Sequence, residues 1–593
     1  MRYAVRPPRA KFVYSPEYQK GIVGMPVDPL RADRVLAFLA NERLVRQEEI
    51  SLPQPAALKN VLLAHTVEYV ESLPRQDVIT EIVGAPVSES EAEQVFELQR
   101  LMAGGTIHAT RLALGTGCVA VNLGGGYHHA GPTRGMGFCV LNDVAIAIKR
   151  LQKSGFEEPI LVVDLDLHDG NGTRQAFADD PQVHTFSIHN DHWGDTRAVA
   201  STSIALGSDV EDELYLGTLL KALPPVVEAH APRLVVYLAG GDVAAEDGLG
   251  NWRITGEGIL VRDRFVVDQV RGCGAALVVV LAGGYGDQAW RHPARFFYWL
   301  LTGSAIEPPP TDELDLLRFR QIKNQLNPLH LTQGEEGNSW ELTEDDLVGI
   351  LPGIPRQTRF LGYFSRVGVE LVLERFGILQ QLRARGFRSP TVQLELDHPL
   401  GQTLRIWGDP SRAELLVEVR LARSGRAIEG MEVLIVEWLL LQNPSESFGP
   451  ERPALPGQSH PGLGMLGEFF GWLVVLAETM GLDGLYFRPS HYHVAAFARH
   501  YAVFVDPEHE AVFRGLERVI AGVGLDRGSA LFEGGEIIDE RSGKPVRWEP
   551  FPMVLPVSER LKVSVGSAER ERAVDEALAE LDFRVASEAP VSG

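Results

Sequence analysis

Two adjacent histidines lie in a glycine-rich stretch of the chain. Residues 124–143 read GGGYHHAGPTRGMGFCVLND, so His128 and His129 follow a triple glycine and precede the pair Gly137–Phe138. Neutral imidazoles take up and release protons near neutral pH, and neighbouring histidines therefore suit proton transfer. This stretch predicts a site of acid–base chemistry.

Carboxylates and an imidazole alternate in a second segment. Residues 164–172 read DLDLHDGNG and come directly behind the apolar run at 160–163. Because alternate residues of a strand project from the same face, we expect Asp164, Asp166 and His168 to point the same way at the carboxyl end of a strand. Open α/β sheets build their sites at that edge. Two oxygen donors and one imidazole suit a divalent metal ion.

Two later segments place further polar residues behind apolar runs. Residues 235–250 read VVYLAGGDVAAEDGLG, and we expect a strand to end at Asp242. Residues 278–286 read VVVLAGGYG, with Tyr285 after a glycine pair. A lone Asp-x-His pair more often caps a strand end or forms a salt bridge. Its combination with these two segments favours a metal site.

In their order along the chain, these four motifs resemble the zinc-dependent histone deacetylase family. That family has the arginase/deacetylase fold, and its bacterial relatives include acetoin-utilisation proteins and acetylpolyamine amidohydrolases. The resemblance implies that Asp166, His168 and Asp242 bind one Zn²⁺ per chain. Three protein ligands leave open coordination positions, as catalytic zinc requires.

The resemblance also implies catalytic roles. Asp164 would orient His128, and His129 would be the general base that takes a proton from water and later protonates the leaving amine. Asn171 would be the uncharged partner of His129, which should keep this imidazole less readily protonated than a carboxylate partner would. Tyr285 would donate its hydroxyl to the oxyanion.

Residues around the substrate are implied in the same way. Gly137 and Phe138 resemble the wall of the acyl-lysine channel, and Arg31 matches a buried channel arginine, although an arginine after Pro-Leu is equally compatible with a surface position. Glu89 is the acidic candidate for holding a substrate backbone amide, against the alternative of a solvated acidic loop. Asp169 departs from the family pattern, which commonly has a second histidine there.

A monovalent cation site is implied as well. The family binds potassium with backbone carbonyls around the first ligand strand, and hard oxygen donors suit such an ion. The matching residues in this chain are Asp164, Asp166, His168, Ser187 and Ile188.

Composition excludes several classes of protein. The chain has 593 residues, 3 cysteines and a formal net charge of -23. This length predicts two or more domains, and the negative charge argues against non-specific nucleic-acid binding, which needs clustered Lys and Arg. The chain shows no bilayer-length apolar run, no signal-peptide core and no disulfide framework. We therefore predict a cytoplasmic protein that binds neither nucleic acid nor membranes, and both a monomer and an oligomer stay open.

Alternating helical and strand patterns predict the organisation of the first part. Residues 1–330 should form an α/β domain with a largely parallel sheet covered by helices on both faces. A helical connector at 331–390 should follow, with one long helical pattern at 360–387. The expected strands are 160–163, 183–188, 234–238 and 277–281, and the expected helices are 32–44 and 93–114.

Residues 391–593 predict a second α/β domain. Strand-like runs at 391–396, 403–408, 414–422 and 431–441 precede a Gly/Pro loop and an apolar helix at 468–480. This order resembles an N-acetyltransferase-like fold. The glycine loop lacks the Arg/Gln-x-x-Gly-x-Gly spacing that would bind a pyrophosphate at a helix N-terminus. A degenerate acyltransferase-like domain, an active one and an unrelated α+β module are the alternatives.

These observations predict zinc-dependent hydrolysis of N-acyl amides, with acetyl-lysine in a protein or peptide as the substrate. An acetylpolyamine or other small acyl amide is the alternative within this class. A bifunctional enzyme, or a regulator whose C-terminal domain binds acyl-CoA, is the alternative from another class. The presence of every implied ligand and of Tyr285 argues against an inactive scaffold.

Overall fold

The computed structural model divides the chain into two compact units. One unit comprises Met1–Arg318 and Leu379–Arg388, and the other comprises Phe319–Ile378 and Ser389–Gly593. The structure describes residues 10–20, 26–46, 49–73, 75–195, 197–286, 288–326, 328–332, 359–449, 453–499, 501–520 and 525–586.

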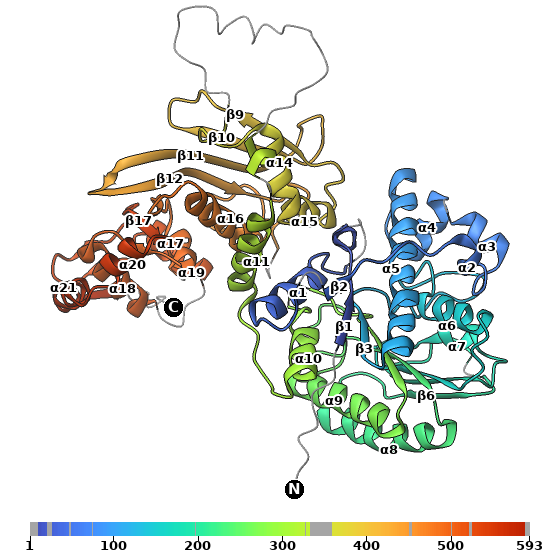
Figure 1. Cartoon of the computed structure of the whole chain (residues 1–593). Coiled ribbons are helices and arrows are strands. Elements are labelled where there is room, and N and C mark those ends of the chain that lie inside the picture. Colours follow the sequence, from blue (N-terminus) through green and yellow to red (C-terminus); the bar gives the residue numbers. More distant parts are fainter. Residues whose placement is uncertain are drawn as a thin grey trace, which may run out of the picture. The chain divides into compact units, whose positions relative to one another are not determined.

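An eight-stranded parallel sheet forms the centre of the N-terminal unit (Figure 1). Its strands lie in the order β2-β1-β3-β8-β7-β4-β5-β6, and each neighbouring pair is parallel. The strands are β1 Ala10–Val13, β2 Ile50–Ser51, β3 Val119–Asn122, β4 Ile160–Asp164, β5 Val183–His189, β6 Ser201–Ala205, β7 Leu234–Leu238 and β8 Ala276–Val280.

Helices cover both faces of this sheet, as the sequence predicts. Figure 1 shows α5 and α6 on one side and α8, α9 and α10 on the other, and α5 contacts β1, β3 and β8 while α9 also contacts β8. The observed architecture is therefore a parallel α/β sheet between two helix layers, as the resemblance implies. The helices are α1 Arg31–Asn41, α2 Leu58–Val61, α3 Val67–Ser72, α4 Gln76–Val83, α5 Glu89–Thr116, α6 Asp143–Lys153, α7 Asn171–Ala176, α8 Asp212–His230, α9 Gly256–Cys273, α10 Arg291–Thr302 and α11 Thr311–Gln325.

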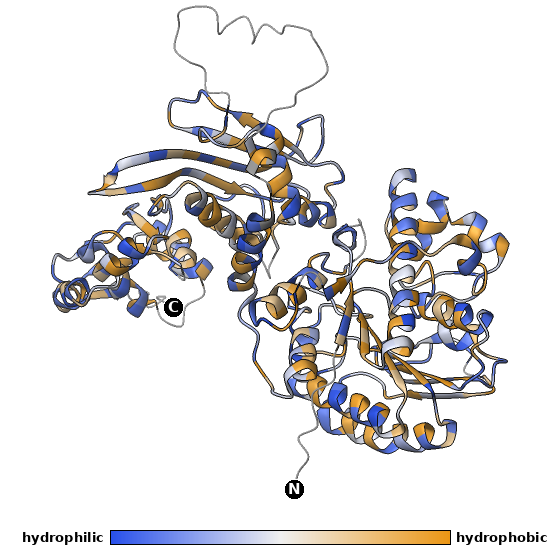
Figure 2. Cartoon of the chain, in the orientation of Figure 1, coloured by the Kyte–Doolittle hydropathy of each residue, from blue (hydrophilic) through white to orange (hydrophobic). Residues whose placement is uncertain are grey.

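The central strands are apolar along their whole length because both of their faces are covered. Every residue of β4 and β7 is buried, and Figure 2 colours the sheet mostly as hydrophobic. Continuous Val, Ile and Leu runs are typical of parallel strands between two helix layers. The predicted strands match β4, β5, β7 and β8 to within one residue at each end.

The C-terminal unit contains a mixed seven-stranded sheet in the order β14-β17-β13-β12-β11-β10-β9. The pairing of β12 with β13 is parallel, and the other described pairs in this sheet are antiparallel. This confirms a second α/β domain with mixed strands. The strands are β9 Thr391–Glu395, β10 Gln402–Trp407, β11 Leu415–Ile428, β12 Met431–Leu441, β13 Gly484–Phe487, β14 Val503–Phe504 and β17 Met553–Pro556.

The C-terminal unit also has a second, smaller group of elements. It contains a three-stranded sheet in the order β16-β15-β18 together with several helices. Its elements are α17 Tyr492–Ala498, α18 Pro507–Val519, α19 Leu525–Glu533, β15 Ile537–Asp539, β16 Lys544–Pro545, α20 Glu559–Val565, α21 Ala568–Ala579 and β18 Phe583–Val585.

Two predicted helices can be compared with the structure. The pattern at 360–387 forms two helices, α14 Arg366–Arg375 and α15 Ile378–Ala384, because Gly377 between them adopts a φ of 87°, a left-handed conformation that ends a helix. The apolar helix is α16 Leu466–Thr479. Within the described part of the chain, no helix is long and apolar enough to cross a membrane. Much of the predicted connector, residues 333–358, lies outside the described residues.

Candidate metal centre

Three donor side chains converge at the carboxyl edge of the parallel sheet. Asp166 and His168 follow β4, and Asp242 follows the neighbouring strand β7. Nδ1 of His168 lies 3.3 Å from Oδ1 of Asp166 and 3.0 Å from Oδ2 of Asp242, so the three ligand atoms face one another. Both carboxylates are buried. Two oxygen donors and one imidazole fit a divalent ion such as Zn²⁺.

The surroundings of the two carboxylates also fit a cation. The N–H of Gly283 donates to Oδ2 of Asp166 at 2.7 Å, and the N–H of Leu167 donates to Oδ1 of Asp242 at 3.0 Å. Such outer hydrogen bonds fix the orientation of metal ligands. A Cβ at Gly283 would lie 2.5 Å and 2.6 Å from the Oδ2 atoms of Asp242 and Asp166, so the position excludes any side chain. Burial and the charge of Asp166 raise the pKa of Asp242, and a bound cation would relieve this repulsion.

The loops that carry these ligands differ from the predicted strands. β4 ends at Asp164, and not beyond His168, because the Asp164 carboxylate accepts the N–H of Asp166 at 3.2 Å and the Asp166 carboxylate accepts the N–H of His168 at 2.9 Å. These side-chain bonds to the backbone replace a strand partner. Similarly, β7 ends at Leu238, four residues before Asp242. The ligands still meet because both loops leave adjacent strands at the same edge.

The two histidines have different partners. Nδ1 of His128 lies 2.8 Å from Oδ2 of Asp164, whereas Nδ1 of His129 lies 2.9 Å from Oδ1 of Asn171. Burial opposes protonation of His128, but the charges of Asp164 and Asp166 outweigh burial and raise its pKa to about 9. Burial and the neighbouring His128 lower the pKa of His129 to about 3. His129 is therefore neutral at pH 7, with its Nδ1–H toward Asn171 and its Nε2 able to accept a proton.

Buried polar contacts hold the histidine loop after β3. Oδ1 of Asp143 accepts the N–H of Gly126 at 3.0 Å and the N–H of Tyr127 at 2.8 Å. The carbonyl oxygen of His128 accepts the N–H of Thr173 at 2.9 Å. These bonds tie the loop to α6 on one side and to α7 on the other.

The loop that carries Tyr285 follows β8 and is held by two charged side chains. Oδ2 of Asp247 accepts the N–H of Tyr285 at 2.7 Å. The buried guanidinium of Arg31 donates to the carbonyl oxygens of Ala282, Gly283 and Gly284 at 2.9–3.2 Å. Arg31 is therefore a buried residue that supports this loop. Burial and the charges of Asp242 and Asp166 raise the pKa of Tyr285, so its hydroxyl keeps its proton.

Aromatic rings lie beside His129 and beside Tyr285. Gly137 has a φ of 55°, and a Cβ there would lie 2.5 Å from Cδ2 of His129. The Phe138 ring lies 6.4 Å from the Tyr285 ring. Trp193, which the sequence reasoning missed, stacks on His129 with centroids 4.4 Å apart and rings 8° from parallel. The signal for it was an aromatic residue in the loop after a predicted parallel strand.

An ion pair holds the loop of Trp193. The two oxygens of Asp169 each accept a hydrogen bond from Arg174 at 2.6 Å, and Oδ2 of Asp169 also accepts the N–H of Trp193 at 3.0 Å. Arg174 further donates to the carbonyl oxygen of Asp195 at 3.2 Å. Asp169 also lies close to His189 and His192, a second group with donor atoms near one another. Because Arg174 already neutralises Asp169, we interpret this group as an ion-pair network.

The remaining predicted residues lie on two elements, β5 and α5. Ser187 pairs with Asp164 in the register of β4 and β5, and Ile188 follows it on β5. Both residues therefore lie on the strand next to β4, which leads into the loop of the metal ligands. Glu89 is exposed and is the first residue of α5, directly after the N-cap Ser88, so it lies on a helix and not in an acidic loop.

The carboxyl ends of four neighbouring strands, β3, β8, β7 and β4, thus bring together a three-ligand cluster with two buried carboxylates, a neutral imidazole and a tyrosine hydroxyl. This arrangement defines a class of protein, the metal-dependent hydrolases of the α/β type. Residues 25–298 match the histone deacetylase domain.

Curated relatives agree with this match. The chain is 31% identical over 294 residues to histone deacetylase 2 of Arabidopsis thaliana, and the aligned segment covers 47% of this chain and 75% of the relative. It is 32% identical over 286 residues to a probable deacetylase of Archaeoglobus fulgidus, covering 44% and 77%. An uncharacterized protein of Picosynechococcus is 33% identical over 289 residues, covering 47% and 95%. The chain belongs to the histone deacetylase family and is a deacetylase-type hydrolase.

The solved structures that match this chain include an HDAC homologue complexed with SAHA and an HDAC homologue from Aquifex aeolicus. Each is 25% identical and covers 52% of this chain and 88% of its own, with a TM-score of 0.45.

Proposed function

We propose that this chain hydrolyses N-acyl amides with one Zn²⁺ held by Asp166, His168 and Asp242, and that acetyl-lysine in a protein or peptide is its substrate. The observation that carries the proposal is the convergence of these three ligands with the neutral imidazole of His129 at one edge of the sheet. Membership of a family that is generally zinc-dependent supports the choice of metal.

The residues of the chain have separate roles in this proposal. Zn²⁺ in this position would lower the pKa of water and polarise the amide carbonyl. His129 accepts the proton at Nε2 as the water oxygen bonds to the carbonyl carbon, and returns it to the nitrogen as the C–N bond breaks, giving a carboxylate and an amine. Tyr285 donates its hydroxyl to the oxyanion. His128, paired with Asp164, adds a fixed positive charge beside the reacting atoms.

The aromatic surface beside the centre fits the alkyl stem of the acylated amine. The rings of Phe138 and Trp193 lie next to Tyr285 and His129, and they offer apolar contact to the stem of a lysine side chain. Glu89 at the start of α5 would hold a backbone amide of a peptide. An acetylpolyamine has no backbone amide, so an enzyme for that substrate would not need Glu89.

A substrate series tests this proposal. We expect acetyl-lysine peptides to give a higher kcat/KM than acetylspermidine or longer acyl amides, with activity lost after chelation and restored by Zn²⁺. A higher kcat/KM for the polyamine would show that the alternative substrate is correct. A zinc-loaded protein that hydrolyses none of these amides would contradict the proposal.

We also propose a potassium ion beneath the centre, bound at Asp164, Asp166, His168, Ser187 and Ile188. The register that pairs Asp164 with Ser187 supports it, because it places carbonyl groups of β4 and β5 side by side. Potassium should raise the melting temperature more than an equal concentration of tetramethylammonium. Equal melting temperatures in the two salts would contradict the site.

For the C-terminal unit we propose an acyltransferase-like domain without an essential catalytic group. Its support is the parallel pair β12 and β13, connected through α16, within an otherwise antiparallel sheet. If the domain binds acyl-CoA, the protein is a bifunctional enzyme or a regulated one. Calorimetry with acetyl-CoA tests this, and we expect no heat of binding, because the loop before α16 lacks the phosphate-binding spacing.

A further inference from the structure

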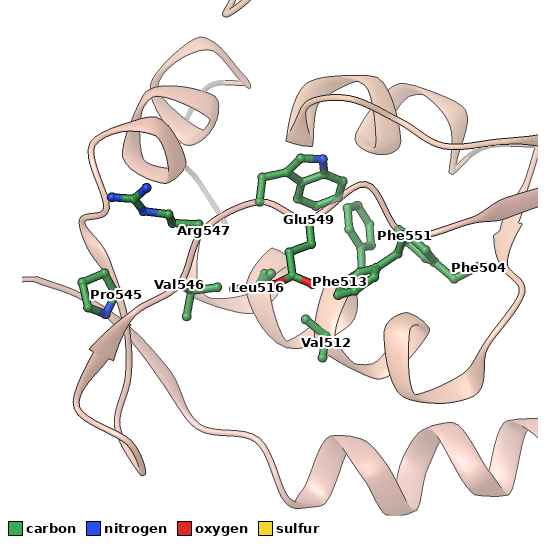
Figure 3. A pocket seen from close by; sticks show the side chains of 10 residues that line it. Phe504, Val512, Phe513, Leu516, Pro545, Val546, Arg547, Glu549 and Phe551 are labelled. Atoms are coloured by element: carbon green, nitrogen blue, oxygen red, sulfur yellow. The ribbon is translucent and has the colours of Figure 1, made fainter. Parts of the chain in front are cut away.

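A cavity of about 230 Å³ lies wholly within the C-terminal unit (Figure 3). Helix α18 and the segment between β16 and β17 supply its walls, together with Phe504 of β14. Four of its lining residues are aromatic: Phe504, Phe513, Trp548 and Phe551. Because ligand sites for drug-sized molecules measure roughly 300–1,000 Å³, a cavity of this size suits a single side chain or a similar small group.

The aromatic walls are held in place by contacts with one another and with residues outside the cavity. Phe504 and Phe513 are fully buried, and their ring centroids lie 5.2 Å apart. Nε1–H of Trp548 donates to the carbonyl oxygen of Pro489 at 2.9 Å. Phe551 stacks on His509 with centroids 3.8 Å apart. The cavity is therefore preformed, which lowers the entropy cost of binding a ligand.

One carboxylate points into this aromatic cavity. Figure 3 shows the side chain of Glu549 directed toward Phe513 and Leu516, whereas the guanidinium of Arg547 points away from them. Among the described residues, no hydrogen bond or ion pair engages the Glu549 carboxylate. The Glu549 side chain is solvent-exposed, and a negative charge beside aromatic rings is complementary to a cation.

The nearby arginines do not supply that cation. Arg499 lies 5.5 Å from the centroid of the Phe513 ring, but its guanidinium is bound to Glu510 at 2.6 Å and to Glu517 at 3.2 Å. Arg514 is bound to Glu510 at 3.0 Å and to a further glutamate at 2.6 Å. Both arginines are therefore already paired with carboxylates, and they share Glu510.

We propose that the cavity lined by Phe513, Trp548, Phe551 and Glu549 binds a primary alkylammonium group, such as an unmodified lysine side chain. The four-carbon stem would contact the rings, and the ammonium would pair with Glu549 and lie over an aromatic face. The ligand is thus the charged form of lysine, which an N-acyl group abolishes. The inference concerns the C-terminal unit alone and stands whether or not the first unit hydrolyses amides.

Calorimetry on the full-length protein tests this site with two matched ligands. Nα-acetyl-lysine methylamide carries the ammonium, and Nα-acetyl-norleucine methylamide has a similar stem without it. We expect the lysine ligand to bind at least tenfold more tightly, and added salt to weaken it. Equal affinity for the two ligands would overturn the proposal, and this comparison needs no variant.

Two substitutions locate the binding and give opposite signs. Glu549→Gln should weaken the lysine ligand about tenfold and leave the norleucine ligand unchanged, because it removes the charge and keeps the shape. Arg547→Gln should leave lysine binding unchanged or tighten it, since it removes a like charge. Both side chains are exposed, so the melting temperature should not change. Unchanged lysine affinity in Glu549→Gln, or weaker affinity in Arg547→Gln, would contradict the assignment.

Discussion

At the scale of single residues, the two imidazoles of the candidate site differ in the group that lies at Nδ1. His128 faces the Asp164 carboxylate and has a pKa of about 9, whereas His129 faces the Asn171 amide and has a pKa of about 3. At pH 7, His128 is therefore protonated and His129 is neutral. This difference indicates that His129, and not His128, is the general base of the proposed reaction.

Asn171→Asp tests that assignment. A carboxylate in this position should raise the pKa of His129, so the acidic limb of the pH–rate profile should move to higher pH. The rate at pH 7 should fall about tenfold for each unit that the pKa rises above 7. Profiles of kcat/KM for both proteins measure this. An unshifted acidic limb would mean that His129 is not the titrating base.

Asp242→Ala tests the metal ligands. The variant should lose most of its zinc, because one of three protein ligands is removed and Asp166 and His168 alone bind weakly. Asp191→Ala, which changes an exposed aspartate of the next loop, is the matched control and should keep its zinc. Elemental analysis of both purified variants gives the answer. Unchanged zinc in Asp242→Ala would remove this residue from the ligand set.

Several of these residue positions could be predicted from the sequence, and others could not. Asp166, His168 and Asp242 follow apolar runs, and short motifs of this kind indicate strand ends. Trp193 and the pairing of Asp169 with Arg174 depend on how the loop after β5 folds back, which no local pattern specifies. Arg31 was equally compatible with the surface, because its three carbonyl partners lie about 250 residues away.

At the scale of the elements, the site depends on the order of the strands. The sequence predicts which runs form strands, but the neighbours β3, β8, β7 and β4 come from distant parts of the chain. The side-chain bonds of Asp164 and Asp166 end β4 early and turn the chain, so the ligands lie on a loop and not on the predicted strand. Strand propensity does not account for side chains that compete with a neighbouring strand for backbone hydrogen bonds.

The buried pair of Asp169 and Arg174 should position the loop of Trp193. Asp169→Asn should raise KM for an acetyl-lysine peptide severalfold while zinc stays bound, because the loop loses its anchor and Trp193 no longer stacks on His129. Breaking a buried pair costs about 3–5 kcal/mol, so the melting temperature should fall as well. Steady-state kinetics with metal analysis measure both effects.

Arg197→Gln is the matched control for this pair. Arg197 and Asp195 form an exposed ion pair next to the same loop, with side chains 89% and 58% exposed. Exposed pairs contribute about 0–1 kcal/mol, so KM and stability should stay unchanged. If Asp169→Asn behaves like this control, the buried pair does not position the loop.

At the scale of the whole molecule, one segment crosses the predicted boundaries. The boundaries 1–330, 331–390 and 391–593 are linear, whereas Leu379–Arg388 belongs to the N-terminal unit. Arg388 lies 3.3 Å from Glu91 and donates to the carbonyl oxygen of Pro86 at 3.0 Å. Sequence patterns find breaks between elements, but they do not show that a later segment returns to an earlier domain.

Truncation tests the importance of this segment. A chain of residues 1–390 should be more stable than a chain of residues 1–330, because the shorter one lacks the buried side chains of Leu382 and Phe387. Each buried side chain of this size contributes about 1.5–3 kcal/mol. Thermal unfolding of both chains measures the difference. Equal melting temperatures would show that the first domain is complete at residue 330.

The central claim is that this centre hydrolyses amides with Tyr285 as the oxyanion donor, and Tyr285→Phe tests it most directly. The measurement is kcat on an acetyl-lysine peptide, together with zinc content, for the wild type and the variant. We expect an active wild type and a variant that keeps its zinc but loses about 10² to 10³ in kcat, the usual loss for one oxyanion donor. A zinc-loaded variant with a kcat near that of the wild type would contradict it.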